Sequence, residues 1–261
     1  MTERVAKRLS RSGVCSRREA ERMINAGRVS VGNRILKTPA TLVSDEDVIK
    51  VDGKKINLPE RVRLWRYHKA PGVLCTNYDA RGRPTLFEQL PKNMPRSMLV
   101  GRLDFNSEGL ILLTNDGTLA RKLELPSTGW VRRYRVRVFG QYEEKLLASL
   151  QAGVLIAGIQ YGPIEAITEE KKASNSWLRL SLREGQNREI RRVMSHMGLE
   201  VNRLIRISYG PFHLGNLPRG GLQEIPASVI EDQIGSHKKS KGIRSRSKQA
   251  QKVEFKNTRC E

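Results

Sequence analysis

Strand-like segments outnumber helical windows in the middle of this chain, and the two kinds of segment do not alternate. The strand-like runs occupy residues 64–68, 109–114, 134–139, 177–182 and 201–208, and the helical windows occupy residues 86–90, 118–125, 143–152 and 189–198. A doubly wound fold with a parallel sheet needs strands and helices in alternation. We therefore expect an α+β fold built on a mixed, largely antiparallel sheet.

The first 58 residues predict a small module ahead of that sheet. Ser16 and Glu19 form a Ser-x-x-Glu capping box at the start of a helix, and Gly27 stands where such a helix ends. Four arginines lie on the exposed side of this helix or just beyond it: Arg17, Arg18, Arg22 and Arg28. These arginines either form an ordinary solvent-exposed face of the helix or bind the phosphate backbone of RNA. We favour RNA binding, because strands joined by tight turns that contain glycine follow the helix.

The net charge of +21 indicates a polyanionic partner. The charge is densest at residues 236–261, which hold nine Lys or Arg residues and two Asp or Glu residues. This segment has one apolar side chain, Ile243, among its first 14 residues, too little for a packed core. We expect three parts: the module at 1–58, a larger domain at 59–235 and a disordered basic tail at 236–261. The tail either aids solubility or adds affinity for RNA.

The sequence excludes several kinds of site. Three widely spaced cysteines and four histidines without helical pairing offer no zinc ligand set, and the odd cysteine count indicates a reducing compartment, which we take to be the cytoplasm. Apolar runs such as 110–113 are far shorter than the roughly 20 residues of a membrane helix. Because the chain has neither a Walker loop nor a Gly-x-Gly-x-x-Gly motif, we expect no nucleotide cofactor.

The most informative segment covers residues 100–117 and reads VGRLDFNSEGLILLTNDG. It places the carboxylate of Asp104 on a polar loop directly before a buried strand. Loops that are held by a rigid strand often carry reactive side chains. Taken alone, however, an Asp in this position is typical of a turn.

The whole segment resembles the catalytic motif of the RsuA-like ribosomal pseudouridine synthases. Further segments resemble the same family in the same order: YHKAPG at 67–72, RGRPT at 81–85, RYRVRV at 133–138, EGQNREIRR at 184–192 and RLIR at 203–206. The N-terminal module resembles the S4-type RNA-binding domain that this branch carries ahead of its catalytic domain. The resemblance covers residues 4–230 and leaves the tail outside.

The resemblance implies isomerisation of a uridine to pseudouridine without a metal or other cofactor. By family likeness Asp104 is the essential carboxylate, which either attacks a carbon or removes a ribose proton. Arg191 matches the arginine that pairs with it, and Tyr134 matches the tyrosine that lies against the uracil. Leu204 matches the apolar residue on the other side of the base. Without the resemblance, Tyr134 and Leu204 would both be assigned to the hydrophobic core. The same motifs imply substrate binding by Arg102, Arg188 and Arg192.

One position departs from the family pattern. Gln186 stands where the family commonly has Arg or Lys, which removes one basic contact for phosphate beside the site. Segments 138–141 and 217–221 look most like the large-subunit type B members, which act on 23S ribosomal RNA. We expect a monomer whose partner is ribosomal RNA, free or in an assembly intermediate, and no membrane association. The alternatives are 16S ribosomal or transfer RNA as substrate, or a non-catalytic assembly factor that binds ribosomal RNA.

Overall fold

The computed structural model describes residues 2–172 and 174–235. The chain divides into two compact units, one of residues 1–226 and one that begins at Ala227. The described part of the second unit is helix α6 (Ala227–Gly235). The predicted tail at 236–261 lies outside the described residues.

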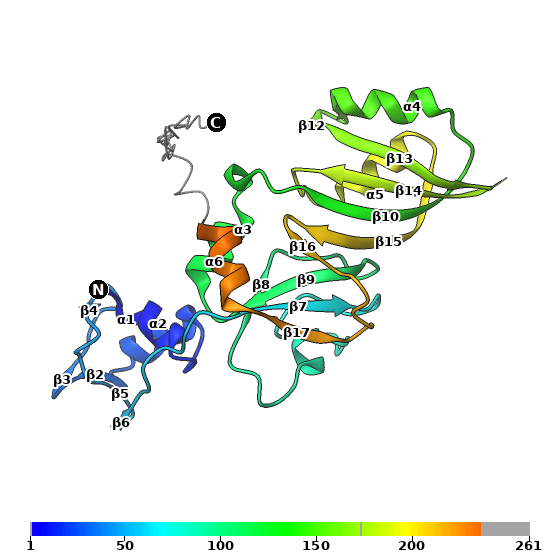
Figure 1. The fold of residues 1–261 in the computed structure, drawn as a ribbon. Coiled ribbons are helices and arrows are strands. Elements are labelled where there is room, and N and C mark those ends of the chain that lie inside the picture. The colour runs from blue at the N-terminus through cyan, green and yellow to red at the C-terminus, as the bar shows by residue number, and fades with distance from the viewer. Residues whose placement is uncertain (1, 173, 236–261) are drawn as a thin grey trace, which may run out of the picture. The chain divides into compact units, whose positions relative to one another are not determined.

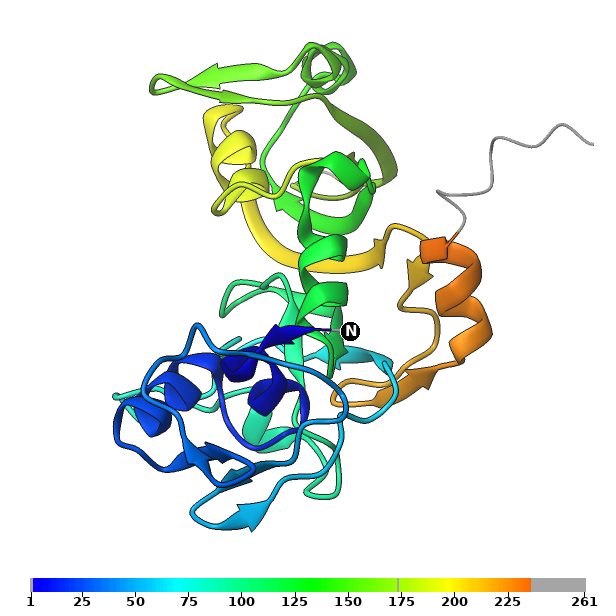
Figure 2. The same ribbon diagram turned by 90° about the vertical axis from the view of Figure 1, so that its left-hand side faces the viewer.

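Two short helices and a small sheet build the N-terminal module (Figures 1 and 2). The helices are α1 (Val5–Arg11) and α2 (Arg17–Asn25), and the four-stranded sheet has the order β3 (Arg34–Ile35), β2 (Val29–Val31), β5 (Ile49–Val51) and β6 (Lys54–Lys55). A separate pair joins β1 (Glu3–Arg4) to β4 (Leu42–Val43). Apolar side chains of both helices and of β2 and β5 form one buried cluster, so the module has a core of its own.

The predicted start and end of α2 are confirmed. The Ser16 hydroxyl oxygen accepts a hydrogen bond from the backbone N–H of Glu19 at 3.1 Å, which satisfies a donor that the first helical turn leaves free. Gly27 follows the helix with φ +71°, a left-handed conformation that glycine adopts without a steric penalty. The sequence of this helix therefore specifies both of its ends locally.

A nine-stranded sheet forms the centre of the larger domain (Figure 1). Its main order is β13 (Ile164–Lys171), β14 (Asn175–Leu182), β10 (Arg132–Phe139), β15 (Glu200–Tyr209), β9 (Glu108–Thr114), β7 (Leu64–Lys69) and β17 (Leu222–Ile225), while β8 (Met98–Val100) pairs with β9 and β16 (Phe212–His213) with β15. All of these pairs are antiparallel except β15 with β9. The expected mixed, largely antiparallel α+β sheet is confirmed.

Three of the four predicted helical windows are helices in the structure. These helices are α3 (Gly117–Glu124), α4 (Glu144–Ser149) and α5 (Glu189–His196). The fourth prediction, at 86–90, was wrong, because the chain there makes only the 3-10 turn η1 (Phe87–Gln89). Pro91 follows at once, and a proline disfavours helical geometry in the residue before it. Two further 3-10 turns, η2 (Pro126–Thr128) and η3 (Leu150–Ala152), and a small hairpin of β11 (Val154–Ile156) and β12 (Ile159–Tyr161) complete the domain.

The parallel contact between β9 and β15 brings two backbones unusually close. Gly109 pairs with Arg206 in this register and has φ +108°. A Cβ atom at Gly109 would lie 2.6 Å from the backbone nitrogen of Arg206 and closer still to its carbonyl oxygen. A glycine is therefore required at the strand that begins directly after the loop of Asp104.

Candidate active site

Asp104 lies on the loop between β8 and β9, as the sequence predicts. Glu124 of α3 accepts the backbone N–H of Gly101 at 2.7 Å, and Leu103 is buried, so the start of the loop is anchored. The backbone N–H of Ser107 donates to the carbonyl oxygen of Asp104 at 3.1 Å and closes a turn. The Asp104 side chain remains 31% exposed and lines a large cleft. The loop thus holds a carboxylate open to a ligand.

A buried lysine fastens this loop to the end of a neighbouring strand. Lys69, the last residue of β7, is fully buried, and its ammonium donates to the carbonyl oxygens of Ala70, Phe105 and Ser107 at 3.0, 3.2 and 2.7 Å. Burial lowers the pKa of Lys69, although nearby acidic groups including Asp104 oppose the shift. Nothing in the motif at 67–72 singles out Lys69, because its bonds to residues 105 and 107 are visible only in the fold.

Side chains from four parts of the domain line one cleft of about 1410 Å³. Tyr134 on β10 and Leu204 on β15 contribute apolar surface on adjacent strands, and both are largely buried. The cleft also contains three of the predicted arginines, Arg102, Arg188 and Arg191. The structure therefore brings together six of the seven predicted catalytic and substrate-binding residues.

The arginine that faces Asp104 differs from the one expected. Arg188 Nη1 lies 3.8 Å from Asp104 Oδ2, and among the described residues it is the one cation within 4 Å of that carboxylate. Arg191 instead donates to the carbonyl oxygens of Val201 at 2.8 Å and Asn106 at 3.3 Å. Burial and the neighbouring Arg188 lower the pKa of Arg191, and the charge of Asp104 opposes this shift. Arg191 is therefore held by two backbone carbonyl groups, and one of them, that of Asn106, belongs to the loop of Asp104.

Arg188 reaches the cleft from a strained backbone at the start of α5. Its φ of +52° is rare for a residue with a Cβ atom and costs of order 1–3 kcal/mol. The buried carboxylate of Glu189 accepts the backbone N–H of Gln186 at 2.9 Å, which holds the preceding turn, and burial raises the pKa of Glu189. Gln186, the departure from the family pattern, donates its side-chain amide to Gln160 and Glu184 at 3.0 Å each. Gln186 therefore ties the β11–β12 hairpin to the turn before α5, at a position where the family commonly has a cationic residue.

Arg192 does not line the cleft. Its Nη1 donates to the hydroxyl of Tyr161 on β12 at 3.3 Å, so its head group lies against the small hairpin. Substrate binding by Arg192 stays a prediction, and the structure gives this residue a contact within the protein. Arg102 is exposed at the cleft, next to the buried Leu103.

The four arginines of the module are all exposed but differ in their partners: Arg17, Arg18, Arg22 and Arg28. Arg22 forms an ion pair with Glu19 of the same helix, and Arg28 forms two hydrogen bonds with Asp52 at 2.8 and 2.6 Å. Arg17 also lines the cleft that contains Asp104. Two of the four charges are thus partly neutralised, and one of the other two belongs to the candidate site.

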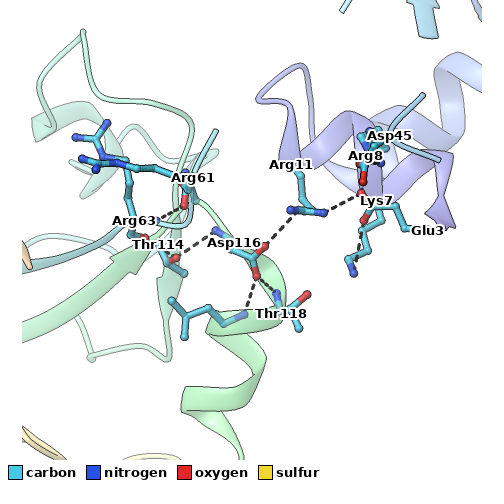
Figure 3. A network of polar contacts seen from close by, with 12 residues as sticks. Glu3, Lys7, Arg8, Arg11, Asp45, Arg61, Arg63, Thr114, Asp116 and Thr118 are labelled. Atoms are coloured by element: carbon cyan, nitrogen blue, oxygen red, sulfur yellow. Dashed lines mark hydrogen bonds and ion pairs between the residues drawn. The ribbon is translucent and has the colours of Figure 1, made fainter. Parts of the chain in front are cut away.

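An ion pair links α1 of the module to the N-cap residue of α3 (Figure 3). Asp116 caps α3 by accepting the backbone N–H groups of Thr118 and Leu119 at 2.8 Å each, and its second oxygen lies 3.3 Å from Nε of Arg11. Arg11 also donates to Glu3 at 2.8 Å. The carboxylate that starts α3 therefore also holds the module beside the cleft.

No group of three or more His, Cys, Asp or Glu residues suited to a metal ion occurs within residues 2–172 and 174–235. Over the same residues, none of the helices is both long and apolar enough to cross a membrane.

Comparison with known proteins matches both the module and the larger domain to known families. Residues 63–196 match the RNA pseudouridylate synthase family, and residues 3–49 match the S4 domain. A protein from Rickettsia felis named as an uncharacterized RNA pseudouridine synthase is 45% identical over 88% of this chain and 99% of its own. The ribosomal large subunit pseudouridine synthase B of Salmonella typhi is 43% identical over 86% of this chain and 80% of its own.

A solved structure agrees with these relationships. A crystal structure of a pseudouridylate synthase matches with a TM-score of 0.61 and 25% identity, over 87% of this chain and 98% of that one. The family match includes Asp104, Tyr134 and Arg191, which line the cleft described above. The chain is therefore a member of the RNA pseudouridylate synthase family with an N-terminal S4 domain.

Proposed function

We propose that this enzyme converts a specific uridine of 23S ribosomal RNA to pseudouridine. One observation carries the proposal: Asp104, Tyr134 and Leu204 line the same cleft together with cationic side chains. The name of the Salmonella typhi relative, which covers most of both chains, favours the large-subunit RNA over 16S ribosomal or transfer RNA.

In the proposed reaction the N1–C1′ bond of the uridine breaks, the uracil turns, and a C5–C1′ bond forms. A proton leaves C5 and a proton is taken up at N1, so the product is an isomer of the substrate. The Asp104 carboxylate serves either as the nucleophile or as the base that takes a ribose proton, and both roles need its ionised form. In the proposal the guanidinium of Arg188, 3.8 Å from this carboxylate, supplies a permanent positive charge beside it, since a guanidinium stays charged at working pH.

The target uridine has to leave its stack before it can react. Extrusion of a base costs a few kcal/mol and is easiest in loops and bulges. In the proposal Tyr134 and Leu204, from the paired strands β10 and β15, receive the two faces of the uracil. Arg102, Arg188 and Arg192 bind the flanking nucleotides, and Arg17, Arg18, Arg22 and Arg28 add affinity for the RNA backbone.

We assign residues 1–58 to the RNA-binding domain and residues 59–235 to catalysis, since the family matches at 3–49 and 63–196 fall within these limits. The enzyme acts in the cytoplasm as a monomer in this proposal. Its substrate is ribosomal RNA, either free or in an assembly intermediate.

Mapping of pseudouridines tests the substrate. Ribosomal and transfer RNA from cells with and without this protein are compared, and cells that express the Asp104→Asn variant serve as the matched control. We expect one pseudouridine of 23S RNA to disappear in the deletion strain and to stay absent with the variant. Loss of a site in 16S or transfer RNA would replace the proposed substrate, and an unchanged map would favour a non-catalytic assembly factor.

A further inference from the structure

An aromatic side chain stands partly exposed beside the proposed catalytic carboxylate. Phe105 follows Asp104 directly, lines the same cleft and is 37% exposed, whereas Leu103 on the other side of Asp104 is buried. Single exposed apolar side chains are common on protein surfaces, so exposure alone does not identify a site. The contacts around this ring, however, favour a role in ligand binding.

The backbone that carries the ring is held in place. The carbonyl oxygen of Phe105 accepts hydrogen bonds from the backbone N–H of Gly72 at 2.8 Å and from the buried ammonium of Lys69 at 3.2 Å. The hydrogen bond from Ser107 to Asp104 closes the turn that contains Phe105. A ring on a fixed backbone loses little conformational entropy when a ligand stacks on it.

A fixed guanidinium lies over the ring, and its residue, Arg83, is not among those that line the cleft. The central carbon of the Arg83 guanidinium is 5.9 Å from the centroid of Phe105. Asp79 accepts two hydrogen bonds from the Arg83 side chain, at 2.7 and 3.1 Å, and these bonds lower the pKa of Asp79 to about 2. Asp79 is therefore ionised at neutral pH and fixes the plane of the guanidinium. Aromatic rings and guanidinium planes are the groups on which unpaired RNA bases stack.

We propose that Phe105, with Arg83 packed over its ring from outside the cleft lining, forms a stacking subsite for a nucleobase next to the extruded uridine. The proposal rests on the proposed function, because it requires an RNA substrate with its target base turned into the cleft. Extrusion removes the stacking partner of both neighbouring bases. A ring one residue from Asp104 replaces that partner for one neighbour, while Tyr134 and Leu204 contact the uracil itself.

Three substitutions at this position separate stacking from simple apolar contact. Phe105→Ala removes the side chain, Phe105→Leu keeps apolar volume without a ring, and Phe105→Tyr keeps a ring. Phe139→Ala is the matched control, since Phe139 at the end of β10 is also exposed, at 47%, but does not line the cleft. Thermal unfolding of each variant establishes that it is folded.

The assay measures single-turnover pseudouridine formation against enzyme concentration, with an RNA stem-loop that contains the mapped uridine. Two further RNAs lack the base immediately 5′ or immediately 3′ of that uridine. We expect Phe105→Ala and Phe105→Leu to raise the half-saturating enzyme concentration by about 5- to 150-fold, the range for loss of one base–aromatic stack. Phe105→Tyr and the Phe139→Ala control should leave it near the parent value.

The RNAs without a neighbouring base identify the ligand. On one of them, the parent and Phe105→Ala should bind equally, because the base that stacks is already missing. Three results would overturn the subsite: parent-like binding by Phe105→Ala, full rescue by Phe105→Leu, or a defect that persists on both abasic RNAs. If the parent itself forms no pseudouridine, the proposed function fails; if only the Phe105 effects are absent, the stacking subsite alone fails.

Discussion

Arg188 faces Asp104 at 3.8 Å, from Nη1 to Oδ2, and does so from a left-handed backbone conformation. Arg191, one helical turn further along the chain, is fixed by the carbonyl oxygens of Val201 and Asn106. The two arginines therefore divide two tasks. One places a cation in front of the carboxylate, and the other ties helix α5 to the loop that carries Asp104.

This division predicts different stability effects for the two arginines. Arg191→Met leaves two carbonyl oxygens without their donor, so we expect a loss of about 1–3 kcal/mol in the free energy of unfolding. Arg188→Met removes an ion pair in which both side chains are partly exposed, so it should change the free energy of unfolding by less than about 1 kcal/mol. Urea denaturation measures both. A larger loss for Arg188→Met would contradict the assignment, whereas both variants should lose activity.

Gly109→Ala should damage both the fold and the site. The added Cβ meets the backbone of Arg206, and φ +108° strains any other residue, so we expect a loss of at least about 2 kcal/mol. Gly198→Ala is the control, since Gly198 also has a positive φ, +76°, but open space around its Cβ position. The control should cost about 1 kcal/mol. Equal thermal shifts in the two variants would show that the close approach of β9 and β15 is unimportant.

Lys69 predicts a particular pH dependence of stability. Burial lowers its pKa in the folded state below the ordinary value of 10.5, so the unfolded chain binds more protons between these two pKa values. The stability of the parent relative to Lys69→Met should therefore rise as the pH increases towards 10.5. Urea midpoints at a series of alkaline pH values give this difference. A relative stability that falls over this range would show that the folded pKa is raised.

The arginines of the S4 domain should differ in their contribution to RNA affinity. Arg18 makes no ion pair with a carboxylate among the described residues, so Arg18→Ala should reduce the slope of log K against log salt by about 0.7. Arg28 is already held by Asp52, and Arg28→Ala should reduce the slope by much less. Salt titrations of binding to a 23S RNA fragment compare the two. Equal slopes would mean that the pairing with Asp52 opens when RNA binds.

Local signals explain which elements the sequence predicts well. The cap of α2 depends on residues three positions apart, and the five predicted strands follow apolar periodicity, so both are visible in the sequence. Strand β13 was missed, because its residues 168–171 are all polar and a register shift between Thr168 and Glu170 interrupts the alternation. The window at 86–90 was mistaken for a helix because Leu86, Phe87 and Leu90 have helical spacing, although the chain there makes only the 3-10 turn.

In the candidate site, too, local sequence predicts some features, whereas others depend on the fold. The motif at 100–117 predicts the loop of Asp104, and the cleft joins it to residues from distant motifs. Which arginine faces Asp104 depends on the left-handed conformation of Arg188, and no residue pattern predicts that for a non-glycine residue. The support that Lys69 gives the loop depends on contacts across more than 30 positions of the chain.

The most direct test of the account is single-turnover pseudouridine formation by Asp104→Asn on the RNA that contains the mapped uridine. The substitution is nearly isosteric and removes the charge that either catalytic role requires. We predict a loss of at least about 100-fold in rate, the lower end for general acid–base catalysis, with RNA affinity close to that of the parent. A variant that retains about a tenth or more of the parent rate would contradict the assignment of Asp104 as the reacting carboxylate.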